Sequence, residues 1–148
     1  MTAWGLPRVH NDGMSTRLAA LIALTAASAT LAGCVPYSDA EDWVLTRMTD
    51  SAGEYSPAEA DLPITLSFDN GGIQGTVCNS YSAPVSGWGN NFSITWIAST
   101  EMACMDPANA MEIETRYLQD LGSVTTITRD GSTLQLTGPD VRLEFASN

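Results

Sequence analysis

Apolar and polar residues alternate along several short stretches of the chain, which is the pattern of a β-strand with one buried face. Ile64, Leu66 and Phe68, for example, alternate with a threonine and a serine. The pattern predicts seven strands, at residues 43–47, 62–68, 73–78, 92–96, 123–129, 132–137 and 141–145.

Turn residues connect these predicted strands. The sequence Asp-Asn-Gly-Gly at residues 69–72 predicts a hairpin turn, because Asn and Gly accept the positive φ that such turns require. A two-residue Asp-Gly loop at residues 130–131 predicts a second hairpin. Residues 80–91, which contain a proline and two glycines, are expected to form a loop.

One amphipathic helix is predicted between the two halves of the strand pattern. Asp106 is a suitable cap, Pro107 suits the first helical position, and Gly122 is expected just past the end. The apolar residues at helical spacing on one face are Ala110, Ile113, Tyr117, Leu118 and Leu121.

These elements predict a mainly β (α+β) domain: a curved antiparallel sheet or open barrel of about seven strands with one helix. The strands are short, and their alternating apolar positions are sufficient to fill a small interior. This disfavours a large cavity for an apolar ligand.

The N-terminal part has the features of a signal peptide. Residues 18–31 are apolar and follow Arg17, and they are too few for the roughly 20 residues of a membrane-spanning helix. Translation from Met14 fits the basic opening of a signal peptide better than translation from Met1. The sequence Leu-Ala-Gly-Cys that ends at Cys34 has the form of a lipobox, after which the signal peptidase cuts and the cysteine carries lipid.

The expected organisation is a leader at residues 1–33, a lipidated tether at residues 34–42 and a domain at residues 43–148. Cleavage after the small residues 27–29 is the alternative, and it would leave Cys34 as a free thiol. Val35 follows the cysteine in place of the aspartate that retains lipoproteins in the inner membrane of enteric bacteria. We therefore expect an anchor in the outer membrane, facing the periplasm.

The chain has three cysteines, and an odd number in an exported protein requires a separate fate for one of them. Lipidation of Cys34 leaves Cys78 and Cys104 as a pair. A disulfide between them would stabilise the domain by about 3–4 kcal/mol on the chain-entropy model.

Composition excludes several kinds of chemistry. His10, the only histidine, precedes the apolar segment, and the chain contains no lysine, so a catalytic triad, a histidine metal site and a P-loop are all excluded from the domain. All but one of the 17 acidic residues follow Cys34, and such a negative domain is expected to repel nucleic acid. We expect no cofactor.

Two possible sites remain. Asp69 and Glu101 could act together as acid and base, although solvated surface is the more common role of carboxylates. Residues 69–80 resemble a calcium loop only faintly, because Ser80 stands where a bidentate glutamate is needed, and we expect no metal site.

Trp88 and Tyr81, in the predicted loop, are candidates for binding a partner. Trp88 could equally cap the end of the sheet.

The order and spacing of several motifs resemble the META domain, the HslJ-like family of small bacterial envelope proteins. The resemblance covers most of the predicted domain. Its motifs are Trp43-x-Leu45, Ile64-x-Leu66-x-Phe68, Gly75-x-x-Cys78-Asn79-x-Tyr81, Ser99-Thr100-x-Met102-Ala103-Cys104, Tyr117-Leu118-x-x-Leu121, Leu134-x-Leu136 and Leu143-x-Phe145.

The resemblance implies an envelope lipoprotein linked to the heat-shock response and to tolerance of the antibiotic novobiocin. It brings no set of catalytic residues. We interpret Asn79 as a residue that hydrogen-bonds nearby backbone at a turn, and Met102 as filling core space beside the disulfide. Tyr81 and Thr100 complete the motif.

Three functions are therefore compared. The favoured one is a non-catalytic envelope lipoprotein that binds or supports another envelope component and is held at the membrane through Cys34. The alternatives are a small barrel that binds an apolar ligand and a carboxylate-based hydrolase.

Overall fold

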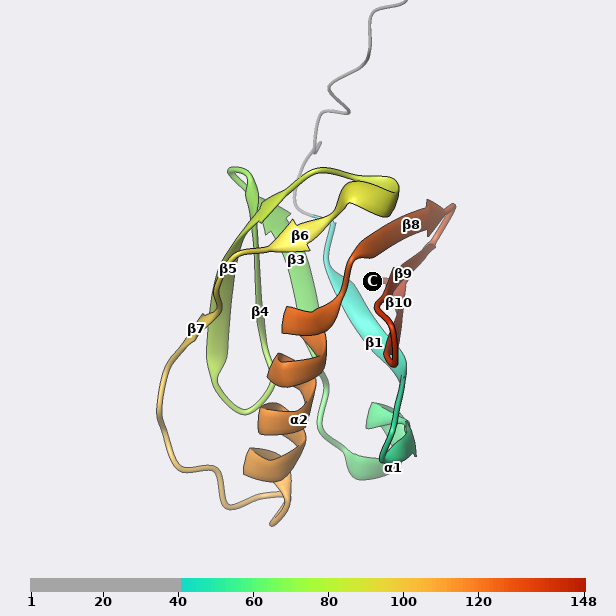
Figure 1. Cartoon of the computed structure of the whole chain (residues 1–148). Helices are drawn as coiled ribbons and strands as arrows, with labels where there is room; N and C mark the ends of the chain where they lie inside the picture. The colour runs from blue at the N-terminus through green and yellow to red at the C-terminus, as the bar shows by residue number, and fades with distance from the viewer. Residues whose placement is uncertain (1–40) are drawn as a thin grey trace, which may run out of the picture. The chain divides into compact units, whose positions relative to one another are not determined.

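The computed structural model describes residues 41–148, a mainly β domain with one long helix (Figure 1). The first half contains β1 (Trp43–Asp50), β2 (Gly53–Tyr55), α1 (Pro57–Ala60), β3 (Thr65–Asp69), β4 (Gly72–Thr76) and β5 (Ser80–Ser86). The second half contains the 3-10 helix η1 (Gly89–Asn91), β6 (Ser93–Ile94), β7 (Ala98–Ser99), α2 (Ala110–Ser123), β8 (Thr126–Asp130), β9 (Thr133–Thr137) and β10 (Arg142–Ser147).

The strands form one antiparallel sheet that curls into a near-closed barrel. Eight of them follow the order β6-β5-β4-β3-β1-β10-β9-β8, while β2 pairs with β1 and β7 pairs with β5. The two end strands, β6 and β8, face each other across the opening, and α2 lies beside it (Figure 1). The predicted fold class is confirmed, and each of the seven predicted strands corresponds to a strand of the barrel.

Large side chains fill the interior of the barrel. Trp43, Phe92, Tyr117 and Phe145 are almost completely buried. The helix α2 contributes the apolar face that its sequence predicts, with Ala110, Ile113, Tyr117 and Leu121 all buried.

The strand β5 was not predicted. It lies in the segment expected to be a loop, and it pairs with β4 on one side and with β6 and β7 on the other. Pro84 suggests a loop, but it lies opposite the gap between β6 and β7. The Pro84 carbonyl accepts a hydrogen bond from the Thr95 N–H on this side of β5. In a strand the N–H and the carbonyl of one residue point to the same side, so the N–H that proline lacks would point into the gap, and no ladder hydrogen bond is lost.

The predicted start and end of the helix were wrong. The helix begins at Ala110, because the Ala110 N–H bonds to the Pro107 carbonyl and closes a turn before it. Gly122 is the penultimate helical residue, since α2 continues to Ser123.

Two further details differ from the prediction. The strand expected at residues 92–96 is reduced to β6, and the side chain of Trp96 is 57% exposed. In the second hairpin Asp130 pairs with Thr133, so the two-residue loop lies one position later than predicted. The first hairpin turn is confirmed, with positive φ at Asn70 and at the glycine that follows.

Among residues 41–148, no helix is long and apolar enough to cross a membrane. The leader, the proposed lipidation site Cys34 and most of the tether lie outside the described residues.

Candidate functional site

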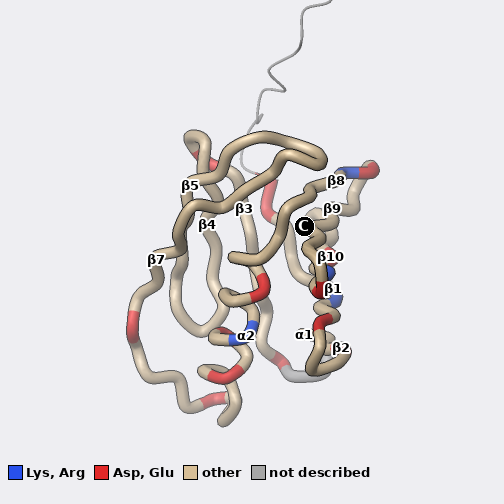
Figure 2. The backbone as a smooth tube through the Cα atoms, viewed as in Figure 1, with Lys and Arg blue, Asp and Glu red and all other residues tan. Residues whose placement is uncertain are grey.

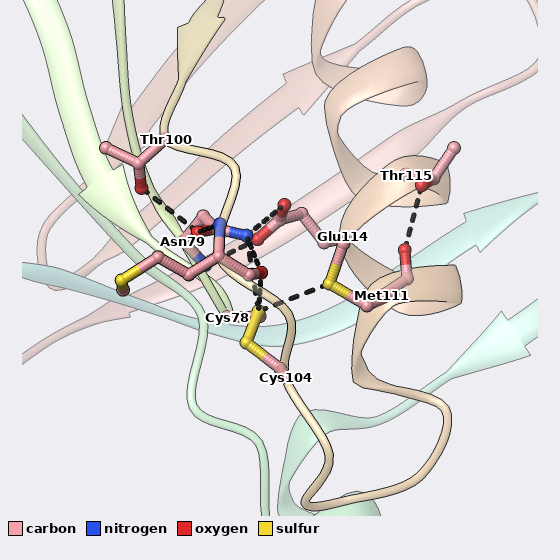
Figure 3. Close-up of a disulfide and its surroundings, with 8 residues drawn as sticks. Cys78, Asn79, Thr100, Cys104, Met111, Glu114 and Thr115 are labelled. Carbon is pink, nitrogen blue, oxygen red and sulfur yellow. Dashed lines mark hydrogen bonds between the residues drawn. A yellow bond between two sulfur atoms is a disulfide. The ribbon is translucent and has the colours of Figure 1, made fainter.

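The disulfide joins the turn between β4 and β5 to the long segment between β7 and α2 (Figure 3). Cys78 and Cys104 are 26 positions apart in sequence, and their Cα atoms lie 6.0 Å apart. The bond predicted from the cysteine count is therefore present in the structure. It fixes an otherwise irregular segment against the barrel.

Asn79 holds the same segment through its side-chain amide, and it is only 1% exposed. Its Oδ1 accepts hydrogen bonds from Thr100 Oγ1 at 3.1 Å and from the Met102 N–H at 2.8 Å. Its Nδ2 donates to the Met102 carbonyl at 3.1 Å and to Glu114 Oε1 at 3.0 Å (Figure 3). Asn79 does bond to backbone, but to that of Met102, 23 positions away, and not to backbone near its own turn. Thr100 bonds to the Asn79 side chain.

Glu114, on α2, completes this arrangement and was not predicted. The residue is 6% exposed, and its Oε2 accepts a hydrogen bond from the Asn79 backbone N–H at 2.5 Å. A buried carboxylate is costly unless it is hydrogen-bonded, and Asn79 supplies two donors. Its position beside Ile113, on the apolar face of the helix, is the signal in the sequence that indicates a buried polar contact.

The interpretation of Met102 as a core residue was wrong. Its side chain is 64% exposed, because its role in the motif is carried by its backbone N–H and carbonyl, which both bond to Asn79. Met105 and Met111 are 83% and 40% exposed, and Met111 Sδ lies 3.5 Å from Cys78 Sγ. We call these three residues the disulfide-flanking methionines.

Tyr81 is not a surface residue, contrary to the prediction of a binding role. It is 3% exposed on β5, and its hydroxyl bonds to the Tyr117 hydroxyl at 2.7 Å and to the Thr65 carbonyl at 2.8 Å. Burial raises the pKa of both phenols. This tyrosine pair joins β5, α2 and β3 within the core.

The model of the META domain matches residues 29–148, which include every element of the barrel. The chain belongs to the META domain family. No curated protein is significantly similar to it in sequence.

Solved structures share the META fold. A protein from Burkholderia xenovorans, solved by NMR, is 24% identical with a TM-score of 0.60, over 74% of this chain and 83% of that one. A DUF4847 family protein from Bacteroides vulgatus, a crystal structure, is 14% identical with a TM-score of 0.54, over 73% and 92% of the two chains.

Trp88, the other predicted binding residue of this META domain, is 36% exposed. It directly precedes η1, and its ring centroid lies 6.4 Å from that of Phe68. This position is consistent with either of its predicted roles.

The structure does not bring Asp69 and Glu101 together. Asp69 ends β3, whereas Glu101 follows β7, and β4 and β5 lie between these two strands in the sheet. A different pair of carboxylates is adjacent in this META domain, Asp50 on β1 and Asp120 on α2.

Arg116 binds Asp50 through two hydrogen bonds, from Nε to Oδ2 at 2.6 Å and from Nη2 to Oδ1 at 2.7 Å. These bonds lower the pKa of Asp50 to about 2. Burial, together with the hydrogen bond to Asp50, raises the pKa of Asp120 to about 7. Asp120 Oδ2 is buried without a hydrogen-bond partner among the described residues, which fits a carboxyl whose charged form is disfavoured. Tyr55 lies nearby, and burial raises the pKa of its hydroxyl.

Short-range sequence patterns did not predict this group of charged residues, because Asp50 on β1 is 66 positions from its partner Arg116 on α2. Within residues 41–148, no three histidine, cysteine, aspartate or glutamate residues come together in a way that could hold a metal ion.

Proposed function

We propose that this META domain protein is a lipid-anchored protein of the bacterial envelope that binds an apolar segment of another envelope protein and catalyses nothing. The observation that carries the proposal is the exposure of the three disulfide-flanking methionines. Met105 directly follows Cys104, and the Met102 carbonyl and Met111 Sδ both lie near Cys78 Sγ, so the disulfide is the feature these residues share. Exposed apolar side chains beside one fixed feature commonly mark an interaction site.

Methionine suits such a site because its unbranched, polarisable side chain adapts to partners of different shape. The backbone of this segment is held by the disulfide and by two hydrogen bonds between the Asn79 side chain and the Met102 backbone. A fixed backbone lowers the entropic cost of binding, while the flexible side chains remain free to fit the partner. The partner class we propose is an apolar protein segment.

The alternative of an apolar ligand inside the barrel has less support. Large side chains, among them Trp43, Phe92 and Tyr117, occupy the interior. Binding at the surface requires no rearrangement of this core.

The alternative of a carboxylate-based hydrolase also has less support. The adjacent pair is Asp50 with Asp120, and both oxygens of Asp50 are already bound by Arg116. A carboxylate held in this way contributes to the packing of α2 on β1 and is poorly placed to attack a substrate.

The distribution of charge disfavours nucleic acid as a partner. Acidic residues are spread over the domain and arginines are few (Figure 2). Each arginine of the described residues lies in an ion pair with an acidic residue: Arg47, Arg116, Arg129 and Arg142. Such paired arginines are poorly disposed to bind a phosphate backbone.

The stress role implied by the family resemblance gives the functional test. Cells that lack the protein would be complemented with the wild type or with the triple variant Met102→Ser, Met105→Ser, Met111→Ser, and survival would be measured in novobiocin and after heat shock. We expect the triple variant to accumulate normally and to lose the protection. The variant Asp120→Asn is the matched control for the hydrolase alternative. Protection by the triple variant, or its loss in folded Asp120→Asn protein, would contradict the proposal.

A further inference from the structure

A pocket of about 310 Å³ lies on the outer face of the sheet formed by β3, β4 and β5. Its volume is at the lower end of the range for small-molecule sites, about 300–1,000 Å³. The side chains that give it its chemistry are Asp69, Asn70, Gln74, Ser82, Pro84 and Trp96.

The register of the sheet builds the floor of this pocket. Gly72 pairs with Pro84 and Gln74 pairs with Ser82, so these four residues stand side by side. Ile73 lies between Gly72 and Gln74 on β4, and Ala83 lies between Ser82 and Pro84 on β5. Both are buried in the core, and successive residues of a strand point to opposite faces, so the four residues point outward. Glycine is required at position 72, since a Cβ there would lie 2.8 Å from the Ala83 carbonyl oxygen of the neighbouring strand.

Trp96 contributes the aromatic part of the pocket. It lies in the segment between β6 and β7, which runs beside β5 because the Thr95 N–H bonds to the Pro84 carbonyl. The side chain is 57% exposed, an unusual position for a large aromatic residue. An indole beside a shallow polar pocket offers a flat apolar surface for stacking.

Polar groups of the pocket have unused hydrogen-bonding capacity. Among residues 41–148, the side chains of Gln74 and Ser82 make no hydrogen bond. The Gln74 amide and the Ser82 hydroxyl can each donate and accept. Asn70 Nδ2 already donates to Asp69 Oδ1 at 2.7 Å, which orients these two side chains at the rim.

We propose that this pocket binds a neutral saccharide with pyranose rings, stacked on Trp96 and hydrogen-bonded by Gln74 and Ser82. A pyranose ring has an apolar C–H face and a rim of hydroxyl groups that donate and accept, which matches an indole beside an amide and a hydroxyl. Asp69 and the negative charge of the domain disfavour an anionic ligand.

Other occupants match the pocket less well. A wholly apolar ligand would remove water from Gln74 and Ser82 without replacing its hydrogen bonds. A peptide that adds a strand needs an unpaired edge, and β4 at this position is paired on both sides. The saccharide proposal is independent of the proposed binding by the disulfide-flanking methionines, which line no part of this pocket.

Saturation-transfer difference NMR tests the proposal on the purified full-length protein in a detergent without a sugar headgroup. The probes are the trisaccharides chitotriose, maltotriose and cellotriose at up to 10 mM. We expect saturable transfer to ring protons of at least one probe, affinity at least tenfold weaker in Trp96→Ala, and several-fold weaker in Gln74→Ala or Ser82→Ala. Thr128→Ala, which removes an exposed hydroxyl from β8, is the matched control and should bind like the wild type.

Near-UV circular dichroism would establish that each variant is folded. Absence of transfer to all three probes would overturn the proposal, as would equal transfer to folded Trp96→Ala protein. A third outcome is that an apolar dye binds the wild type but not Trp96→Ala, while no saccharide binds. This outcome would assign the pocket to apolar ligands and would also overturn the saccharide proposal.

Discussion

The carboxylate of Glu114 accepts hydrogen bonds from the backbone N–H and from the side-chain amide of Asn79, at 2.5 and 3.0 Å. These residues are 35 positions apart and belong to α2 and to the turn after β4. The contact connects the helix to the segment that carries the disulfide. Cys78 and Asn79, which are adjacent in sequence, hold the same segment by different bonds: the disulfide to Cys104 and the hydrogen bonds to the Met102 backbone.

Removal of either partner should destabilise the domain. Asn79→Ala keeps the backbone N–H that bonds to Glu114 Oε2, but it removes the amide that donates to Oε1 and both bonds to the Met102 backbone. Glu114→Ala leaves two Asn79 donors unpaired, so we expect a loss of about 2–4 kcal/mol in each case. Urea unfolding would measure it. A double-mutant cycle should give a coupling energy of about 1–3 kcal/mol.

Glu112→Gln is the matched control, since Glu112 is exposed on the same helix, and its effect should stay within about 0.5 kcal/mol. An unfolding free energy of Glu114→Ala protein equal to that of the control would show that the contact does not stabilise the domain.

The Asp50–Asp120 pair should make stability depend on pH in two opposite ways. The Asp120 pKa is raised from 3.8 to about 7, so between these values the folded state binds more protons and stability falls as pH rises. The Asp50 pKa is lowered to about 2, so its contribution is present above about pH 4 and is lost as pH falls to 2.

Asp120→Asn should remove the first of these effects, because asparagine has no carboxyl group to titrate. At pH 8 the variant should be more stable than the wild type by about 1–2 kcal/mol, less than the full pKa difference implies because solvent reaches the pair. Thermal unfolding between pH 3 and pH 9 would measure the profile. Parallel profiles for the two proteins between pH 4 and pH 7 would contradict the raised pKa of Asp120.

The strand pattern was predictable wherever apolar side chains alternate and face the core. β3, β9 and β10 were identified in this way, although their ends differ from the prediction by up to three residues. β5 carries the same alternation, with Tyr81 and Ala83 buried. Its proline and its small polar residues have the composition of a loop, and only the gap between β6 and β7 explains how a proline fits there.

The disulfide of the candidate site was predictable, because it follows from the number of cysteines. The burial and the partners of other site residues were not predictable, because they depend on tertiary contacts. If Cys34 is assigned to the predicted lipid anchor, two cysteines remain, and this pair predicts the disulfide. The burial of Tyr81 depends on Tyr117, and the ion pair of Asp50 depends on Arg116. Both contacts join segments that approach each other only when α2 packs on the barrel.

The lipid anchor is tested by Cys34→Ser, which removes the thiol that would carry the lipid. We expect the variant to be released from the membrane fraction or to remain as an unprocessed precursor. Cell fractionation and mass spectrometry of the N-terminus would distinguish these forms from the wild type. A variant that is processed normally and stays in the membrane fraction would contradict lipidation at this cysteine.

Photocrosslinking in intact cells tests the proposed binding role most directly. A benzoylphenylalanine would replace Met105, the most exposed of the disulfide-flanking methionines, and in a separate strain Thr128, which is exposed on β8. We expect a discrete crosslinked species from position 105 that contains an envelope protein, is absent from position 128, and is lost when Met102 and Met111 are also replaced by serine. The same crosslinks from both positions, or none from position 105 in folded and membrane-localised protein, would contradict binding through these methionines.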